Sequence, residues 1–358
     1  MNTRIEQLRE KMQLHHIEFL LVTTKANRRY LSNFTGSNGL LVVGLHEVFL
    51  ILDGRYTEQA QQQTQGVTIY ITSHEKNQWD YLTEIVGTQT LGFEAATASY
   101  PIYQALCKNF ASEQLSETHQ WIEQLRLVKE PHELAALQKA AALADQTFAY
   151  ITTIIKPGMS ELDVANEIDY YSKRIGSEGP AFETIVASGV RTALPHAHAS
   201  KKIIQANELI MIDFGCIVEG YYSDMTRTFA LGEVSETIQA VYADVLAAQQ
   251  AAIAHITLNQ PLKELDQCAR QYLAERQLAE HFTHNLGHGI GLTCHEYPAL
   301  DLKNEQLIVP NMVFTVEPGV YLAGDFGIRI EDDVLVTADG RSQCLTKTPK
   351  EWMVVPCN

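Results

Sequence analysis

The chain has 358 residues, enough for two domains of ordinary size, and 46% of them are hydrophobic, so a core can form without disulfides or a structural metal. Asp and Glu total 43 against 27 Lys and Arg, for a net charge of −16, which argues against nucleic-acid binding because phosphates require a basic surface. The six cysteines include no C-x-x-C pair and are expected to be free thiols in a reducing compartment. No apolar run approaches the ~20 residues that span a bilayer, and no signal peptide is readable, so we expect a cytoplasmic protein without a membrane partner.

The first third of the chain alternates compact apolar runs with helical stretches. Apolar side chains at helical spacing predict an amphipathic helix over residues 5–14, and a second helix is predicted over 56–65. Strands alternating with helices indicate a small α/β domain, which we place at residues 1–124. The predicted strands are 19–22, 40–43, 48–52 and 67–71.

The pattern changes near Leu125, where we place the start of a second domain, residues 125–358. A long Ala- and Leu-rich pattern predicts a helix over 131–155. Ser160 and Asp163 have the spacing of a capping box and predict the start of the next helix. Further helices are predicted over 235–255 and 262–277, and strands over 312–316, 328–330 and 334–337.

Two acids flank a predicted turn in the second domain. An apolar strand runs into Asp213, the chain turns near residues 218–220, and the returning segment carries Asp224. In a hairpin centred on that turn the two acids lie roughly opposite each other, with Cβ atoms about 4.5–5.5 Å apart. Carboxylates that close repel unless a proton or cation lies between them. The alternative is two surface acids beside a turn.

A second hairpin repeats this arrangement. The apolar strand 312–316 ends at Glu317, the chain turns near residues 323–325, and the strand 328–330 returns to Glu331. A single Glu after an apolar strand is usually a solvated strand end. Two facing pairs of acids in one chain favour a shared ligand.

Histidines supply the other chemistry. His284, His288 and His295 fall within twelve residues, among glycines that allow close approach of the backbone to a ligand. Imidazole and carboxylate ligands suit zinc, manganese, iron and cobalt. His196 follows Pro195 in an extended or turn segment that a cleft can reach. For each histidine the alternative is a core or surface side chain. Together with the four acids, these residues indicate metal-assisted hydrolysis of an acyl bond.

Five motifs in order resemble the pita-bread metallopeptidases, which include methionine aminopeptidase, aminopeptidase P and prolidase. These motifs are MIDFG, YYSDMTRT, HNLGHGIGLTCHE, TVEPGVY and IRIEDD, between about Leu125 and Cys357. The N-terminal strings YLSNFTGSNG and LDGRYTEQA are similar to the additional domain of the proline-specific members. The resemblance therefore implies an α+β fold: a small N-terminal α/β domain of creatinase/prolidase type, followed by a pita-bread catalytic domain.

The resemblance also implies roles for individual residues. Glu317 would accept the proton of a water bridging two metal ions, and His196 and His295 would bind the substrate. Arg329, two residues before Glu331, would pair with a carboxylate or the ligand, and Thr226 would hydrogen-bond a ligand carboxylate. Proline-specific members usually have glycine after the proline–histidine pair, where this chain has Ala197, so His198 is an alternative to His196. The implied metal ligands are Asp213, Asp224, His288, Glu317 and Glu331.

The activity implied by the resemblance is hydrolysis of the Xaa-Pro bond in dipeptides by a hydroxide that bridges two divalent ions. Manganese is the expected ion, with cobalt or zinc as alternatives. One alternative activity is that of an aminopeptidase P, which acts on longer peptides. Two others are a metal-independent hydrolase like the creatinases and a non-catalytic binding module. The resemblance further implies a homodimer whose substrate is a small peptide with proline in the second position.

Overall fold

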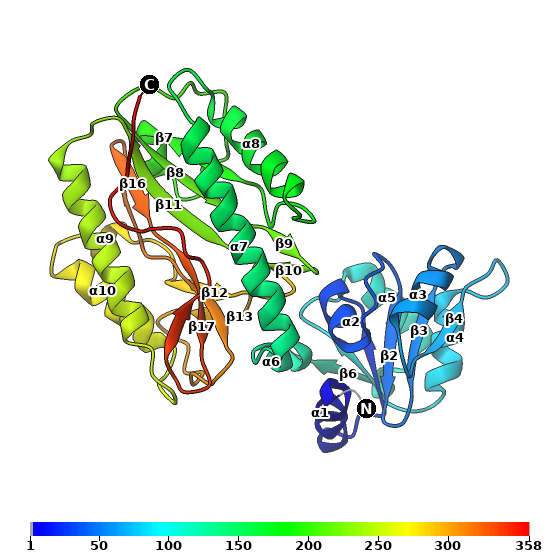
Figure 1. Ribbon diagram of the computed structural model, residues 1–358. Helices are drawn as coiled ribbons and strands as arrows, with labels where there is room; N and C mark the ends of the chain where they lie inside the picture. Colours follow the sequence, from blue (N-terminus) through cyan, green and yellow to red (C-terminus); the bar gives the residue numbers. More distant parts are fainter. Residues whose placement is uncertain (1–2, 358) are drawn as a thin grey trace. The chain divides into compact units, whose positions relative to one another are not determined.

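The computed structural model describes residues 3–357, which divide into two compact units (Figure 1). The N-terminal unit ends at Arg126 and the C-terminal unit begins at Leu127. The domain boundary expected from the sequence falls two residues before this division. No helix in residues 3–357 is long and apolar enough to cross a bilayer.

The N-terminal unit is built on a mixed sheet of six strands in the order β4-β3-β2-β1-β5-β6. Strands β1, β2 and β3 pair antiparallel, whereas β4, β5 and β6 join by parallel pairing. Apolar side chains of β2, β3 and β5 pack against α4 and α5 to form the core of this unit. Its elements are α1 (Thr3–Leu14), β1 (Phe19–Val22), α2 (Lys25–Ser32), β2 (Leu40–Gly44), β3 (Val48–Leu52), α3 (Thr57–Gln63), β4 (Thr68–Ile71), α4 (Gln78–Val86), β5 (Leu91–Glu94), α5 (Tyr100–Asn109), β6 (Leu115–Thr118) and α6 (Trp121–Arg126).

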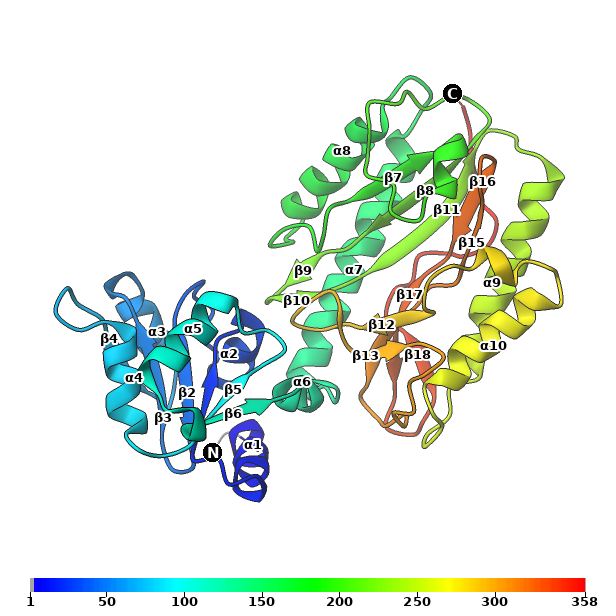
Figure 2. The same cartoon turned by 180° about the vertical axis from the view of Figure 1, so that it is seen from behind.

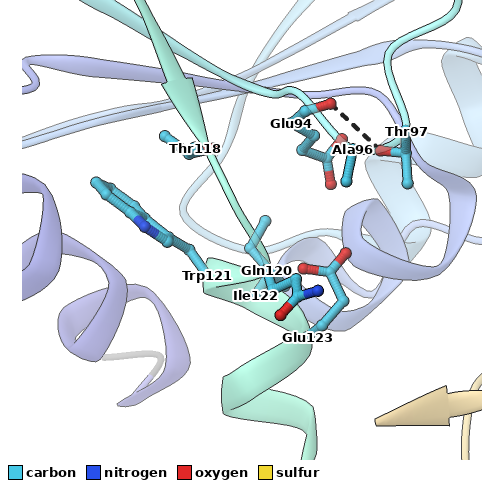
Figure 3. Close-up of a pocket in the computed structure, with 8 residues that line it drawn as sticks. All are labelled: Glu94, Ala96, Thr97, Thr118, Gln120, Trp121, Ile122 and Glu123. Carbon is cyan, nitrogen blue, oxygen red and sulfur yellow. Dashed lines mark hydrogen bonds between the residues drawn. The ribbon is translucent and has the colours of Figure 1, made fainter.

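A buried carboxylate, that of Glu94, joins the end of β5 to the start of α2. Its oxygens accept hydrogen bonds from Thr23 N (2.6 Å), Thr24 N (3.0 Å), Thr24 Oγ1 (2.8 Å) and Asn27 Nδ2 (2.6 Å). Figure 3 shows the small pocket beside it, which Glu94 and Glu123 line. Asn27 Nδ2 also donates to Glu123 Oε1 (2.6 Å). Neutral donors satisfy both oxygens of Glu94, so this acid fixes the fold.

The C-terminal unit contains two larger sheets, in the orders β19-β11-β8-β7 and β13-β12-β14-β17-β18. Two short hairpins, β9–β10 and β15–β16, extend the strand pairs β8–β11 and β14–β17. Its helices are α7 (Pro131–Ile154), α8 (Glu161–Arg174), α9 (Glu236–Ala254) and α10 (Lys263–Ala274). Its strands are β7 (Ile185–Ser188), β8 (Glu208–Phe214), β9 (Ile217–Val218), β10 (Tyr221–Tyr222), β11 (Met225–Leu231), β12 (Gly287–Gly289), β13 (Glu296–Leu300), β14 (Val313–Val316), β15 (Gly319–Leu322), β16 (Phe326–Arg329), β17 (Asp332–Val336), β18 (Ser342–Cys344) and β19 (Val354–Val355).

Two pairs of helices cover these sheets. Helices α7 and α8 share a core with β8 and β11, and α9 and α10 share another with β14, β16 and β17. Both views show the first pair beside β7 and β8 and the second pair near β16 (Figures 1 and 2). The predicted capping box at the start of α8 is confirmed, since Asp163 N donates to Ser160 Oγ (3.0 Å) and Ser160 N to Asp163 Oδ2 (2.8 Å).

Alternation along β8 fixes the face on which its acid lies. Ile210, Ile212 and Phe214 point into the core formed with α7 and α8. Asp213 therefore points to the opposite face of the strand. A slip of one residue would turn the carboxylate into that apolar core. The packing of β8 against α7 and α8 thus specifies the direction of the acid.

Several predicted elements differ in extent by one to three residues, the most in α10, which was predicted over 262–277 and ends at Ala274. The helix predicted over 56–65 is α3, and residues 54–56 before it form a 3-10 turn in which Arg55 N donates to Asp53 Oδ1 (3.1 Å). The strand predicted over 328–330 ends at Arg329. Ile330 and Glu331 fall between β16 and β17, where the chain passes from one strand partner to another.

Candidate active site

The first pair of acids lies at a different register from the one predicted. Asp213 on β8 is opposite Thr226 on β11, and Asp224 precedes β11. The cause is the two-residue turn at Glu219 (φ 49°) and Gly220 (φ 67°), which centres the hairpin one residue later than expected. The resulting offset of two residues keeps the parity of the strand, so both carboxylates remain on one face.

The second pair of acids follows the predicted register. Val316 pairs with Asp332 on one side and Gly319 with Arg329 on the other, so Glu317 and Glu331 are opposite each other in the gap between the two strand pairs. In this gap each backbone bonds elsewhere: Glu317 N donates to Leu286 O (2.8 Å) and Glu331 N to Thr226 O (3.1 Å). Both side chains are therefore held at the ends of paired strands.

His288 on β12 joins these acids. Its Nε2 lies 3.6 Å from Asp224 Oδ2 and 3.4 Å from Glu317 Oε1, and its Nδ1 lies 3.1 Å from Gly289 O. One ligand atom each from Asp224, His288 and Glu331 lie within 4.8 Å of one another. Residues more than a hundred positions apart in the chain thus converge on one centre.

The acids are buried and repel one another. Exposure is 8% for Asp213, 4% for Asp224 and 2% for Glu331. Burial and then the neighbouring carboxylates raise the pKa of Asp224 and of Glu331 well above the usual range. Burial also raises the pKa of Glu317 to about 7, against the opposing effect of Arg329. Asp213 Oδ1 and Asp224 Oδ1 are buried without a hydrogen-bond partner. Such a set is stable in its ionised form only with added positive charge.

Arg329 supplies one positive charge next to this cluster. Its Nη2 donates to Asp213 Oδ2 (2.6 Å) and its Nε to Thr226 Oγ1 (3.0 Å), while Nη1 donates to Pro195 O (3.1 Å). Thr226 Oγ1 in turn donates to Glu331 Oε2 (2.5 Å), the kind of contact expected from the sequence. One guanidinium cannot balance four acids, so the cluster would carry excess negative charge when all four are ionised.

The predicted substrate-side histidines lie at the exposed edge of the cluster. The ring of His295 stacks on that of His288 with centroids 3.9 Å apart, and burial lowers the pKa of His295 to about 4. His196 is exposed and close enough to His295 and His284 to depress their pKa further. His198 instead pairs with Glu183 at the surface, with Nδ1 3.0 Å from Oε1.

The substitution of Ala197 for the usual glycine fits the fold. Ala197 is 3% exposed and packs with Ala187 and Met211 in a small apolar cluster. Its methyl group therefore holds the segment down beside His196.

Sequence reasoning assigned no role to three residues of this site. Tyr321 OH bonds Arg329 Nη1 (2.6 Å) and His284 Nε2 (2.9 Å), which links two residues that the motifs had singled out separately. Cys294 Sγ donates to Asp224 Oδ2 (3.1 Å), and Asp333 Oδ2 accepts from Asp224 N (3.1 Å). All three lie inside the quoted motifs, but strand pairing does not reveal which side chains meet across sheets.

Comparison with known proteins agrees with this geometry. The family model for metallopeptidase family M24 matches residues 135–338, and that for the creatinase/prolidase N-terminal domain matches residues 4–128. The chain belongs to metallopeptidase family M24. Its fold is the expected α+β arrangement of an N-terminal creatinase domain followed by an M24 catalytic domain.

Full-length relatives extend this result. The chain is 34% identical over 355 residues to the Xaa-Pro dipeptidase of Pyrococcus furiosus, covering 99% of this chain and 100% of the relative. It is 38% identical to the solved Xaa-Pro dipeptidase from Bacillus anthracis, with a TM-score of 0.94 and coverage of 98% and 99%. It is 35% identical to the solved X-Pro aminopeptidase from Thermotoga maritima, with a TM-score of 0.89 and coverage of 97% and 100%. This M24 protein is accordingly a metallopeptidase.

Proposed function

We propose that this M24 metallopeptidase hydrolyses the Xaa-Pro bond of dipeptides at a centre of two divalent metal ions. The observation that supports this most strongly is the convergence of buried acids that the protein leaves incompletely paired. The orphaned oxygens of Asp213 and Asp224 and the raised pKa values of Asp224 and Glu331 fit a site built for cations. The proposed ligands are Asp213, Asp224, His288, Glu317 and Glu331.

Carboxylate oxygens and one imidazole suit manganese, which we propose as the ion, with cobalt or zinc as alternatives. When bound, two such ions would polarise the substrate carbonyl and lower the pKa of a water molecule. Arg329 holds Asp213 by the 2.6 Å ion pair, and Thr226 holds Glu331, so both carboxylates are fixed in orientation.

The protein's own groups move the proton and bind the peptide. We assign Glu317 as the proton acceptor for the attacking water, because its carboxylate lies within the cluster, with Oε1 3.4 Å from His288 Nε2. His295 and His196, exposed beside the acids, would bind the substrate carbonyl and the proline end. Neutral His295 can donate one hydrogen bond without adding charge.

The proline preference rests on the relatives, since those from P. furiosus and B. anthracis are Xaa-Pro dipeptidases that match this chain over its whole length. The N-terminal creatinase/prolidase domain supports the same assignment. A cytoplasmic location and a homodimer accompany this proposal.

A second candidate is an Xaa-Pro aminopeptidase, which the similarity to the T. maritima enzyme favours. A dipeptidase must recognise the free carboxylate of proline, whereas an aminopeptidase leaves that end of the site open. The test compares kcat/KM for Ala-Pro and Ala-Pro-Ala on protein reconstituted with manganese. We expect Ala-Pro to be strongly preferred, and tripeptide cleavage at an equal rate would replace the dipeptidase assignment.

The same assay separates the remaining alternatives. A creatinase-like hydrolase would keep full activity after a chelator has removed every metal ion. A binding module would cleave neither peptide with any of the three metals. The proposed function predicts loss of turnover on chelation and its return when manganese is added.

A further inference from the structure

Glu161, the first residue of α8, is a buried acid outside the candidate metal centre. It has no exposed surface, and its two oxygens together receive hydrogen bonds from three residues. Oε1 accepts from Ser188 N (2.8 Å), Ser188 Oγ (2.9 Å) and Arg191 Nε (3.2 Å). Oε2 accepts from Arg191 Nε (3.0 Å), Ser200 N (3.2 Å) and Ser200 Oγ (2.7 Å). One carboxylate thus joins both ends of the segment that carries His196, residues 189–199, which we call the His196 segment.

Further contacts tie the His196 segment to the same point. Arg191 Nη2 donates to His198 O (2.7 Å), and Leu162 N, in the first turn of α8, donates to Ser200 O (2.9 Å). In the middle, Pro195 O accepts from Arg329 Nη1 (3.1 Å). The His196 segment contains a 3-10 turn, Gly189–Ala193, and one isolated bridge to β7, so these side-chain contacts replace the strand pairing that would otherwise fix it.

We infer that Glu161 is a positioning residue that holds the His196 segment, and so places His196 at the substrate side of the site. This inference rests on the proposed function, in which His196 binds the peptide. Glu161 acts only through this segment and is not itself part of the reacting centre.

Both oxygens of Glu161 are needed as hydrogen-bond acceptors, so a neutral side chain of equal length cannot replace it. Backbone N–H groups of Ser188 and Ser200 donate to different oxygens of the carboxylate, and a backbone N–H cannot become an acceptor. In Glu161→Gln one oxygen becomes an NH2 group, which must face one of these N–H donors. The amide can therefore hold one end of the His196 segment but not both. A side chain of equal size should still release the segment.

The test uses Glu161→Gln in the full chain, with Asp163→Asn as the matched control. The control makes the same change from acid to amide two residues further along α8. Asp163 accepts one backbone bond, from Ser160 N, which the carbonyl oxygen of Asn can keep. Hydrogen exchange of residues 189–199 is the readout that does not depend on turnover. We expect faster exchange there in Glu161→Gln and unchanged exchange in Asp163→Asn.

Kinetics then separate positioning from general destabilisation. For Ala-Pro hydrolysis we expect Glu161→Gln to lower kcat/KM by about 10- to 100-fold, the scale of a ~1 Å misplacement of a binding group. Combined with His196→Ala, it should add little further loss, because both changes remove the same interaction. Losses that multiply in the double variant, or a Glu161→Gln variant with wild-type kcat/KM, would overturn the inference.

A milder variant covers the case in which Glu161→Gln does not fold. Ser200→Ala removes the hydroxyl bond to Glu161 and keeps the backbone bond. It should give a smaller loss with the same lack of additivity with His196→Ala, and additive losses would again contradict the inference. If the wild-type protein cleaves no Xaa-Pro peptide, the proposed function fails. Hydrogen exchange then still decides whether Glu161 holds the His196 segment.

Discussion

Glu94 in the N-terminal unit and the acids of the candidate metal centre in the C-terminal unit have opposite surroundings. In the N-terminal unit, Glu94 accepts hydrogen bonds from backbone and side-chain donors at both oxygens. In the C-terminal unit, Asp213 and Asp224 each keep a buried oxygen without a partner and lie among other acids. A saturated carboxylate stabilises the fold, whereas an unsaturated one is available for a ligand. Burial alone does not distinguish the two roles, but the inventory of donors does.

The variant with the largest expected effect on this comparison is Asp224→Asn. Removing one charge from the crowded cluster relieves repulsion, so the metal-free variant should melt at a higher temperature than the wild type in the presence of a chelator. Turnover of Ala-Pro should fall by more than about 100-fold, beyond the usual cost of losing a residue that only supports a ligand. Calorimetry and steady-state kinetics measure the two effects. A variant that is less stable without metal, or fully active with manganese, cobalt or zinc, contradicts the comparison.

Protonation of His284 should lower the stability of the C-terminal unit in acid, whereas the raised pKa values of Asp224, Glu317 and Glu331 act in the opposite direction. Burial, and next Arg329, lower the pKa of His284 to about 4 from 6.5, so the unfolded chain binds more protons than the folded one between these values. Stability is therefore present above pH 6.5 and is lost as the pH falls towards 4, by on the order of 3 kcal/mol. Urea unfolding from pH 7 to 4 measures this slope. The difference in slope between the wild type and His284→Gln isolates this contribution, and an unchanged slope in that variant would remove His284 as its cause.

Glu94→Gln should have the opposite effects to Asp224→Asn, since it should lower stability and leave turnover unchanged. The amide cannot accept at both positions, so one set of donors loses its acceptor and the N-terminal unit should lose about 1–3 kcal/mol of stability. Turnover per folded molecule should not change, because this acid lies in the unit without the proposed metal ligands. Urea unfolding and kcat/KM for Ala-Pro provide the two values. A stable variant with impaired turnover would assign Glu94 to function.

The smallest expected effect is that of His198→Ala, compared with His196→Ala in the same segment. His198 is exposed and pairs only with an exposed partner, Glu183, among the contacts described. Such surface pairs are worth about 0–1 kcal/mol. We expect His198→Ala to retain wild-type kcat/KM and His196→Ala to lose most of it. The reverse result would exchange the roles of the two histidines.

Much of the site was predictable because strand periodicity and turn spacing act locally. The apolar run before Asp213 predicted a strand that ends in an acid, and the second hairpin followed its predicted register at Glu317 and Glu331. The first hairpin did not follow its predicted register, because its turn is centred one residue later than expected. The position of that turn depends on the left-handed backbone conformation of Glu219 and Gly220, which spacing alone does not reveal.

Contacts between separate elements were beyond the sequence. The link from Tyr321 to His284 and Arg329 joins three motifs, and the six bonds of Glu161 join α8 to the His196 segment and its flanking residues. Each depends on how sheets and helices pack, which periodicity does not encode. The sequence indicates only that Glu161, at the start of a helix, interacts favourably with the helix dipole, and nothing in it indicates the buried partners of this residue.

Counting the metal ions bound per chain tests the central claim most directly. Wild-type protein stripped with a chelator should bind two ions per chain when it is titrated with manganese in a calorimeter. Elemental analysis of the metal-loaded protein gives the same count independently. Asp224→Asn should bind fewer, and turnover of Ala-Pro should rise in step with occupancy. A wild-type chain that binds no divalent ion, or that turns over fully after all metal is removed, would contradict the proposal.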